Sequence, residues 1–408
     1  MPGSQGTATL ATHLAHYGPM SAPARAEERV ALIEEVRSAG LLGRGGAAFP
    51  TARKIAAVVE RGGVPVVVAN GTEGEPASVK DKVLLARSPQ LVLDGAVLAA
   101  AAIAAREVFV AVHSAVREIV DEALEERRRQ RLDRVRMRIE TAAPGFVAGE
   151  ASAVVNWLEG GAPLPRATPP RLAERGLHGR PTLVHNVETL AHLALIARYG
   201  SRWFRRIGTE DEPGSMLITL VGAIRRSGVY ESAIGAPVGK VLARAGGASS
   251  PLRAFLFGGY FGRWVPAEKA LERPLSNAGL APIGGGSGAG LVVALPREAC
   301  GLRETANVVR YLAGESAGQC GPCRFGLPAL ASEFESIATG RPFDPNRLER
   351  WLAQVEGRGA CSHPDGVVRL IRSALTVFQD EVVLHRDGWC SASGVGESVI
   401  PIPSRGAR

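Results

Sequence analysis

Cysteine is scarce in this chain: there are five among 408 residues, and two of them, Cys320 and Cys323, form a tight pair. This usage does not fit a secreted scaffold held together by disulfides. The first 25 residues lack the apolar core of a secretion signal, and no stretch offers the roughly 18 uninterrupted apolar residues that a spanning helix needs. We therefore expect a cytoplasmic protein without a transmembrane segment of its own, which could sit peripherally on a membrane complex through a partner.

Lysine is also rare, and arginine supplies most of the positive charge. Lysine occurs only at positions 54, 80, 82, 240 and 269. An arginine-rich composition is typical of a GC-rich genome, so the net charge of +8 is weak evidence for nucleic acid, and we expect no nucleic-acid partner. The basic run 127–131 lies on a helical pattern and is read as a solvated face, although such a face could dock an acidic redox partner.

The order of apolar patterns along the chain indicates several domains. Strand-like runs at 64–69, 107–112 and 135–139 alternate with helical patterns, which favours an α/β layer with a mostly parallel sheet. From residue 214 the pattern changes to a small mixed sheet with one helix, and after Cys300 helices dominate. The divisions we expect are a mobile N-terminal segment (1–26), an α/β domain (27–213), a small α+β domain (214–295), a helical bundle (296–390) and a mobile C-terminal tail (391–408).

Two loops in the α/β region combine glycine with polar side chains. The first, 43–46, feeds a helix that contains Lys54, so bare backbone N–H groups and the positive helix end could meet a phosphate. Taken alone this signal is weak, because many turns are rich in glycine. The second, 70–76, leaves a buried strand and carries Asn70 and two carboxylates, which suit the polar edge of a ring or a ribose. Glu150, at another helix start, is either a ligand or a helix cap.

The stretch 315–324 carries the strongest chemical signal. Cys320 and Cys323 are followed at a distance by Cys361, an arrangement that holds a metal ion or an iron–sulfur cluster. Ala317 stands where a regular Cys-x-x-Cys-x-x-Cys loop would carry its first ligand.

Together these features resemble one family: the flavoprotein subunit of respiratory complex I and the NADH-oxidising subunits of soluble hydrogenases and formate dehydrogenases. The resemblance runs from about Gly40 to Arg386. It rests on five ordered motifs: GRGGAAFPTARK (43–54), NGTEGEPASVKDK (70–82), GEASA (149–153), GRPTLVHNVETL (179–190) and ESAGQCGPCR (315–324).

The resemblance implies FMN in the α/β domain, a ubiquitin-like fold for 214–295 and a helical domain whose loop carries a 4Fe–4S cluster. In relatives NADH gives hydride to FMN and electrons leave singly through the cluster; here they would pass to a small ferredoxin-like protein or a membrane reductase. Glu73 and Glu75 are the candidate catalytic carboxylates. Carried over by position, the expected cofactor contacts are Arg44, Gly45, Gly46, Phe49, Lys54, Asn70, Glu73, Gly149, Glu150, Asn186 and Thr189.

The chain also departs from the family pattern around the flavin. Gly71-Thr72 replaces Ala-Asp, Ala151 replaces a second glutamate, no aromatic follows Lys54, and Thr168-Pro-Pro-Arg171 replaces Lys-Pro-Pro-Phe. These changes suggest that flavin binding survives better than NADH binding. NAD(H) is therefore a possible substrate, and a non-catalytic assembly subunit that has lost NADH oxidation is the alternative.

The fourth ligand of the cluster is open at this stage. We favour Cys300, because a helix near 302–313 could return the chain to the cluster loop, over His363; a cluster with one open iron is a third option, and Cys300 could simply be a buried small side chain. Two rival interpretations are a zinc site made by the three thiols with His363 and a thioredoxin-like dithiol at Cys320-Gly-Pro-Cys323. The second is disfavoured because that motif normally follows a strand early in a βαβ unit.

Overall fold

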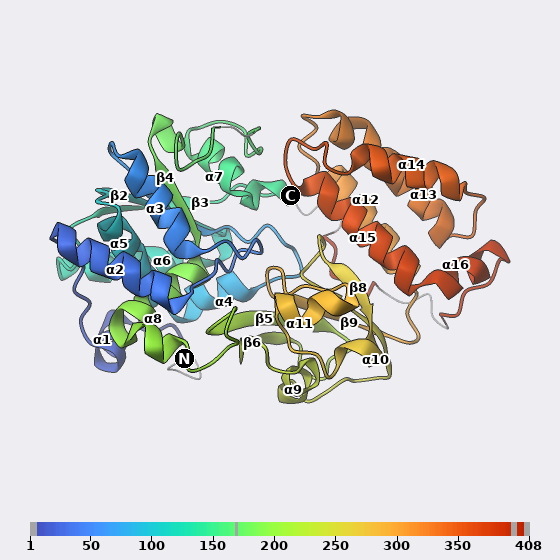
Figure 1. Cartoon of the computed structure of the whole chain (residues 1–408), viewed down its shortest axis with the longest axis horizontal. Coiled ribbons are helices and arrows are strands. Elements are labelled where there is room, and N and C mark those ends of the chain that lie inside the picture. Colours follow the sequence, from blue (N-terminus) through green and yellow to red (C-terminus); the bar gives the residue numbers. More distant parts are fainter. Residues whose placement is uncertain (1–5, 168–169, 393–397, 404–408) are drawn as a thin grey trace. The chain divides into compact units, whose positions relative to one another are not determined.

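The computed structural model describes residues 6–167, 170–392 and 398–403, so Thr168 and Pro169 of the altered proline segment lie outside the described residues. The chain forms two compact units (Figure 1). The first contains Met1–Gly74, Val79–Pro144 and Ala148–Leu217, and the second contains Glu75–Ser78, Gly145–Val147 and Ile218–Arg408.

The first unit is built on a four-stranded parallel sheet in the order β3-β2-β1-β4. Its strands are β1 (Val66–Gly71), β2 (Glu107–Val112), β3 (Arg136–Thr141) and β4 (Thr182–Asn186). Val66 to Ala69 are fully buried, as expected where helices cover both faces of a parallel sheet. The predicted parallel α/β layer is confirmed. The strand-like runs that we found in the sequence did not include β4.

Helices surround this sheet. They are α1 (Leu10–Tyr17), α2 (Ala26–Ala39), α3 (Thr51–Arg61), α4 (Lys80–Arg87), α5 (Pro89–Ala102), α6 (Arg117–Arg129), α7 (Ala151–Leu158) and α8 (Val187–Phe204). The Ala-rich α5 is almost entirely buried, and it packs closely on α8. A Cβ at Gly95 would lie 1.9 Å from the carbonyl oxygen of Leu190, so only glycine allows this approach.

The second unit begins with a five-stranded mixed sheet in the order β6-β5-β9-β7-β8. The strands are β5 (Ser215–Gly222), β6 (Gly228–Ala233), β7 (Leu252–Phe257), β8 (Arg263–Pro266) and β9 (Leu291–Pro296), with the short helices α9 (Val238–Arg244), α10 (Ala267–Ala270) and α11 (Asn277–Leu280). β5 and β9 are parallel, whereas β7 is antiparallel to both β8 and β9. This matches the small mixed sheet that the sequence predicts.

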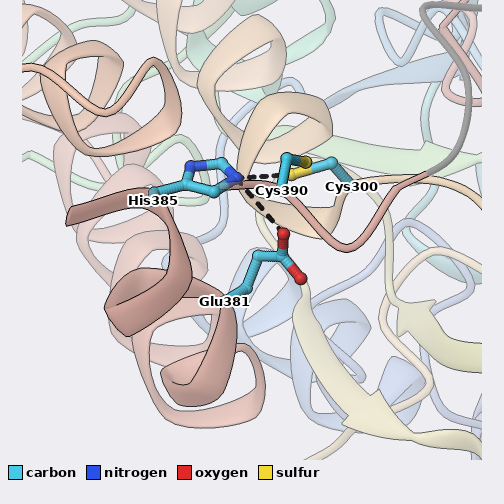
Figure 2. Close-up of side chains that lie close together, drawn as sticks. All are labelled: Cys300, Glu381, His385 and Cys390. Atoms are coloured by element: carbon cyan, nitrogen blue, oxygen red, sulfur yellow. Dashed lines mark hydrogen bonds and ion pairs between the residues drawn. The ribbon is translucent and has the colours of Figure 1, made fainter. Parts of the chain in front are cut away.

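The rest of the second unit is helical. Its elements are α12 (Gly301–Gly314), a π-helical turn at Pro322–Gly326, α13 (Leu327–Ala338), α14 (Pro345–Val355), α15 (His363–Val377) and α16 (Gln379–Arg386). One continuous core, with Trp264, Phe334 and Phe378 among its largest members, joins the mixed sheet to these helices. The division at residue 296 therefore stays a prediction. Cys300 precedes α12 and faces side chains of α16 (Figure 2).

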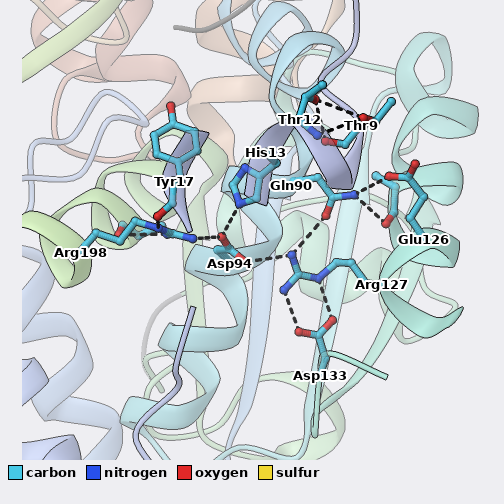
Figure 3. Close-up of polar contacts among 12 residues, drawn as sticks. Thr9, Thr12, His13, Tyr17, Gln90, Asp94, Glu126, Arg127, Asp133 and Arg198 are labelled. Carbon is cyan, nitrogen blue, oxygen red and sulfur yellow. Dashed lines mark hydrogen bonds and ion pairs between the residues drawn. The ribbon is translucent and has the colours of Figure 1, made fainter. Parts of the chain in front are cut away.

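The N-terminal segment that we expected to be mobile contains a packed helix, so that expectation was wrong for α1. Leu10 is buried and donates its N–H to Glu126 at 2.8 Å, and His13 Nε2 lies 2.8 Å from Asp94 Oδ2 (Figure 3). Asp94 also accepts from Arg127 and Arg198. Burial alone would raise the pKa of Asp94, but these three partners lower it to about 2. The main-chain N–H of Leu10 and the side chain of His13, one turn apart, thus anchor α1 to two acidic side chains.

Among the described residues, no single helix has both the length and the apolar composition to cross a membrane. The helices α4 and α5 are long and apolar enough only when taken together, and the chain bends by 97° between them.

Candidate functional site

Two asparagines occupy matching positions at the carboxyl edge of the parallel sheet. Asn70 in β1 is the register partner of Asn186 in β4. Asn70 Nδ2 donates to the carbonyl of Gly149 at 3.0 Å, and Asn186 Nδ2 donates to Asp81 at 2.6 Å. Asn186 also caps α8, because its Oδ1 accepts the N–H of Glu188 at 2.9 Å. Ligands of open parallel sheets bind beyond this edge, so the two residues lie where the sequence predicts a cofactor.

Glycines leave bare backbone around these asparagines. A Cβ at Gly149 would lie 3.1 Å from Gly74 N and 3.1 Å from Thr72 Oγ1, and one at Gly45 would lie 3.4 Å from Asn186 Cβ. Gly46 has φ +104°, a conformation that favours glycine. Three loops, at 43–46, 70–74 and 149, therefore come together at the strand ends, so closely that a side chain at Gly45 or Gly149 would contact its neighbour.

A buried ionic group holds Asn186 at this edge of the sheet. Lys80 Nζ lies 2.7 Å from Asp81 Oδ1 and 2.8 Å from Glu188 Oε2, and all three side chains are buried. Burial raises the pKa of Asp81 to about 6 despite Lys80. For Glu188 burial acts in the same direction, but Lys80 and His192 lower its pKa to about 2. The group ties the start of α4 to the start of α8, and Asp81 in turn holds Asn186.

The two cationic residues expected at the cofactor already have protein partners. Arg44 donates its backbone N–H to Thr189 Oγ1 at 2.9 Å, and its guanidinium donates to the carbonyls of Leu42, Pro213 and Ser215. Lys54 Nζ donates to the carbonyl of Val184 at 2.6 Å, and burial lowers its pKa. Arg44 and Thr189 therefore pin the glycine loop to α8. Their direct contact with a cofactor stays a prediction.

The three candidate carboxylates bind main-chain N–H groups. Glu73 accepts from the N–H groups of Asp81 and Lys82 at 3.1 and 3.2 Å. Glu150 is the N-cap of α7 and accepts from Ser152 and Ala153, so the cap alternative describes its contacts. Glu75 belongs to the second unit and accepts the N–H of Tyr260 at 3.1 Å. The catalytic assignment of Glu73 and Glu75 stays a prediction.

Two further residues lie at this edge: Phe49, which we predicted as a cofactor contact, and His185, which we did not. Phe49 is 47% exposed, and the Arg53 guanidinium lies over its ring, 5.6 Å from the ring centre. His185 was missed, because we did not recognise β4 as a strand. It is buried, its Nε2 has no hydrogen-bond partner among the described residues, and burial together with nearby Lys54 lowers its pKa well below the usual value.

The predicted cluster loop brings three thiols together in the second unit. The Cys320 sulfur accepts the N–H groups of Ala360 and Cys323; these bonds lower its pKa although burial acts to raise it. Burial, followed by the neighbouring Cys320 and Cys361, raises the pKa of Cys323 to about 12. Backbone N–H groups directed at sulfur are among the features that tune iron–sulfur clusters.

Cys300 is not part of this group, so our preferred fourth ligand was wrong. It precedes the first residue of α12, whose 14 residues span about 21 Å. His363, two residues after Cys361, is hydrogen-bonded to the carbonyl of Leu312 near the other end of that helix, at 2.8 Å. The helix therefore carries the chain away from Cys300 instead of returning it. The sulfur of Cys300 lies 3.6 Å from Nε2 of His385.

The rival zinc interpretation has no support from the spacing of its ligand atoms. In the part of the chain that the structure describes, the cysteines at 320, 323 and 361 with His363 do not form a group whose ligand atoms could surround one ion. A wider arrangement is what a cluster of four irons requires. The dithiol interpretation also fails, because the Cys-x-x-Cys pair follows helix α12 and not a strand. His363 is buried, and its Nδ1 has no partner among the described residues.

Comparison with known families defines the class of protein. Residues 36–195 match the Nuo51 FMN-binding domain, and residues 303–385 match the iron–sulfur binding region of NADH-ubiquinone oxidoreductase-F. The two matches fall on the sheet edge and on the three-thiol loop described above. The chain is thus a flavin- and iron–sulfur-binding redox protein.

Individual relatives identify the family. The chain is 31% identical over 372 residues to the second NADH-quinone oxidoreductase F subunit of Rhizobium meliloti, covering 87% of this chain and 88% of the relative. It is 31% identical to the corresponding F subunit of Streptomyces coelicolor, covering 88% and 83%. The chain belongs to the family of NADH-quinone oxidoreductase F subunits. Its fold is also similar to a chain of an NAD+-reducing [NiFe]-hydrogenase, with TM-score 0.81 and 32% identity, covering 88% of this chain but only 63% of the hydrogenase chain.

The residues present fit both cofactors of the family, although each site departs from the family pattern. For FMN, the bare backbone at Gly45 and Gly149 and the amides of Asn70 and Asn186 provide a polar cradle. Thr72 stands where the family pattern has aspartate, and its hydroxyl bonds Asn70 Oδ1 at 2.8 Å, so the cradle carries one charge less. For the cluster, three of the four thiolates of a regular site are in place.

Proposed function

We propose that this chain is the electron-input subunit of a redox complex. It takes electrons from an NADH-type donor in its first unit and delivers them singly from its second unit to another subunit. FMN, when bound, supplies the exchange between two-electron and one-electron chemistry. The observation that carries the proposal is the pairing of Asn70 with Asn186 beside the glycine backbone at 45 and 149.

The protein groups at the cradle have separate tasks. Asn70 and Asn186 present amides at the strand ends, and Glu73 positions the start of α4 through its two main-chain contacts. Lys80 bonds Asp81, and Asp81 in turn accepts from Asn186 and keeps it in place. These residues act by orientation, because a binding site built from fixed groups loses little free energy in ordering itself when the ligand arrives.

Cys320, Cys323 and Cys361 hold the 4Fe–4S cluster in this proposal. The chain has five cysteines, and Cys300 and Cys390 lie in another group. The fourth iron is therefore without a cysteine ligand from this chain. Of the two remaining alternatives, an open iron and His363, the second has one supporting observation: its buried Nδ1 lacks a partner among the described residues.

The relatives support a proposal about partners and location. The relatives described above are named as subunits of NADH-quinone oxidoreductases, and the similar solved structure is an NAD+-reducing hydrogenase. We infer a subunit partner that accepts single electrons, either a small ferredoxin-like protein or a membrane reductase. A cytoplasmic location, with peripheral attachment to such a complex, remains our prediction.

A non-catalytic assembly subunit is the second candidate, and the neutral Thr72 favours it. Anaerobically purified protein should be assayed for flavin, iron and sulfide and then titrated with NADH. We expect bound FMN that NADH bleaches, and visible iron–sulfur absorbance that Cys320→Ser abolishes while flavin is retained. If the purified protein contains no flavin and its spectrum does not change when NADH is added, the assembly role is favoured.

A further inference from the structure

The two cysteines outside the cluster loop meet two side chains of α16. Cys300 precedes α12, Cys390 follows α16, and Glu381 and His385 project from consecutive turns of α16 (Figure 2). One ligand atom from each of the four residues lies within 4.8 Å of all the others. Cys300, Glu381 and His385 are buried, and Cys390 is partly buried. We refer to these four residues as the α16 group.

The spacing inside the α16 group fits a single tetrahedral ion. Zinc–sulfur bonds of about 2.3 Å and zinc–nitrogen or zinc–oxygen bonds of about 2.0–2.1 Å, at tetrahedral angles, separate sulfur from nitrogen by about 3.6 Å and nitrogen from oxygen by about 3.3 Å. The sulfur of Cys300 lies 3.6 Å from Nε2 of His385, and that Nε2 lies 3.2 Å from Oε1 of Glu381. The ligand atoms of Cys300, His385 and Glu381 are therefore spaced as they would be around one ion, and that of Cys390 lies within 4.8 Å of each of them.

The hydrogen bonds around the α16 group orient these ligands. Nδ1 of His385 lies 2.9 Å from the carbonyl oxygen of Ile337. A carbonyl only accepts, so Nδ1 carries the proton, and Nε2 faces the other three residues. This arrangement is the usual support of a metal-bound histidine. Glu381 is held in the same way: Arg253 donates to its Oε2 at 2.8 Å, and the N–H of Ser391 donates to its Oε1 at 2.8 Å.

The contact between His385 and Glu381 brings two acceptor atoms together unless a proton or a metal ion lies between them. With Nδ1 protonated, neutral His385 presents a lone pair to a carboxylate oxygen 3.2 Å away, and two acceptors at that distance repel each other. A proton on Nε2 would relieve this one pair. A metal ion would relieve it as well and would also use the two sulfurs that converge on the same point, which a proton does not.

We propose that Cys300, Glu381, His385 and Cys390 bind one zinc-type divalent ion at a structural site separate from the iron–sulfur cluster. Two thiolates, an imidazole and a carboxylate are ligand types of zinc. Four protein ligands leave no open position, so the site is structural and not catalytic. Four ligand atoms within 4.8 Å of one another leave no room for a four-iron cluster. The ion would tie the start of α12 to α16 and to the segment after it.

The test is a metal count on four proteins purified from zinc-supplemented cultures: the full chain and its variants Cys320→Ser, Cys390→Ser and His385→Gln. We expect about one zinc per chain in the full chain and in Cys320→Ser, which loses iron. Cys390→Ser and His385→Gln should lose zinc but keep iron. Loss of zinc in Cys320→Ser, or undiminished zinc in Cys390→Ser, would overturn the proposal.

A second measurement covers variants that fail to fold. The full chain is stripped with a chelator and titrated with Co²⁺, and cobalt–thiolate absorption should appear with one equivalent and disappear when zinc is added. Zinc should also raise the unfolding temperature of the stripped full chain, because it binds the folded state. If neither metal binds, or if thiol titration shows a Cys300–Cys390 disulfide, the α16 group is only a hydrogen-bonded cluster and the proposal is wrong.

Discussion

Asn70 and Asn186 stand opposite one another at the ends of β1 and β4, and each amide reaches a different partner: Gly149 for Asn70 and Asp81 for Asn186. One pair of adjacent strands thus positions both the glycine at the start of α7 and the buried ionic group. The predictions below test this edge, the packing around it and the thiol loop.

Gly149→Ala should weaken FMN binding without unfolding the protein. The new Cβ would come within 3.1 Å of both Gly74 N and Thr72 Oγ1, so the loop that carries these two residues must shift beside the space that we assign to the flavin. We expect affinity for FMN to fall at least about tenfold, which corresponds to about 1.4 kcal/mol, in a fluorescence titration of flavin-free protein. Gly314→Ala, where nothing lies within 4 Å of the added Cβ, is the matched control. Equal affinities in the two variants would contradict the cradle.

Lys80→Met should destabilise the first unit strongly. Lys80 is the cation between Asp81 and Glu188, which are both buried, and its removal leaves two uncompensated carboxylates. Breaking a buried pair in this way costs about 3–5 kcal/mol, to be read from urea unfolding. Lys240→Met, at an exposed position of α9, should change the free energy of unfolding by less than about 0.5 kcal/mol. A small effect of Lys80→Met would show that the buried group is not held by this charge.

Asp94 should make the free energy of unfolding depend on pH in acid. Its folded pKa of about 2 lies below the ordinary value of 3.8, so its contribution is present above pH 4 and is lost as pH falls from about 4 to about 2. The contribution is about 2 kcal/mol. Asp94→Asn should flatten that part of the curve, whereas exposed Asp211→Asn should not. Because acid destroys iron–sulfur clusters, both are compared in the cluster-free Cys320→Ser background. Parallel curves for the two variants would refute this account of Asp94.

Ala317→Cys should strengthen the cluster. Ala317 occupies the position of the first cysteine in a regular loop, so the substitution offers the fourth iron a thiolate. We expect the variant to keep four irons during mild oxidation that converts the parent protein to a three-iron form, as followed by iron analysis and electron paramagnetic resonance. Ser316→Cys, one residue away, is the control. Identical iron loss from parent and Ala317→Cys would show that the fourth iron already has a firm ligand.

The sequence was informative wherever local pattern and fold agree. Continuous apolar runs such as 64–69 predict buried parallel strands, and glycine with asparagine at a strand end predicts a ligand edge. It was misleading where tertiary packing decides. β4 contains the polar residues Thr182, His185 and Asn186 and was not among the predicted strands, yet its pairing with β1 makes it a strand.

The second source of error was that a sequence does not give the direction of a helix or the distance between residues at its two ends. The spacing between Cys300 and Cys320 says nothing about which end of α12 faces the cluster loop, and the straight helix separates them. Cys300 is separated from His385 and Cys390 by about a fifth of the chain, so no local sequence motif predicts that these residues lie together. Likewise α1 is too short for a periodic signal, and its order comes from Asp94 and Glu126.

The most direct test of the proposed function is an anaerobic reduction of the intact chain by one equivalent of NADH, followed by optical and electron paramagnetic resonance spectra of the same sample. The account predicts that the flavin absorbance falls and that a cluster signal appears, which Cys323→Ser removes without preventing flavin reduction. A chain that binds FMN and iron but stays fully oxidised in the presence of NADH would contradict it.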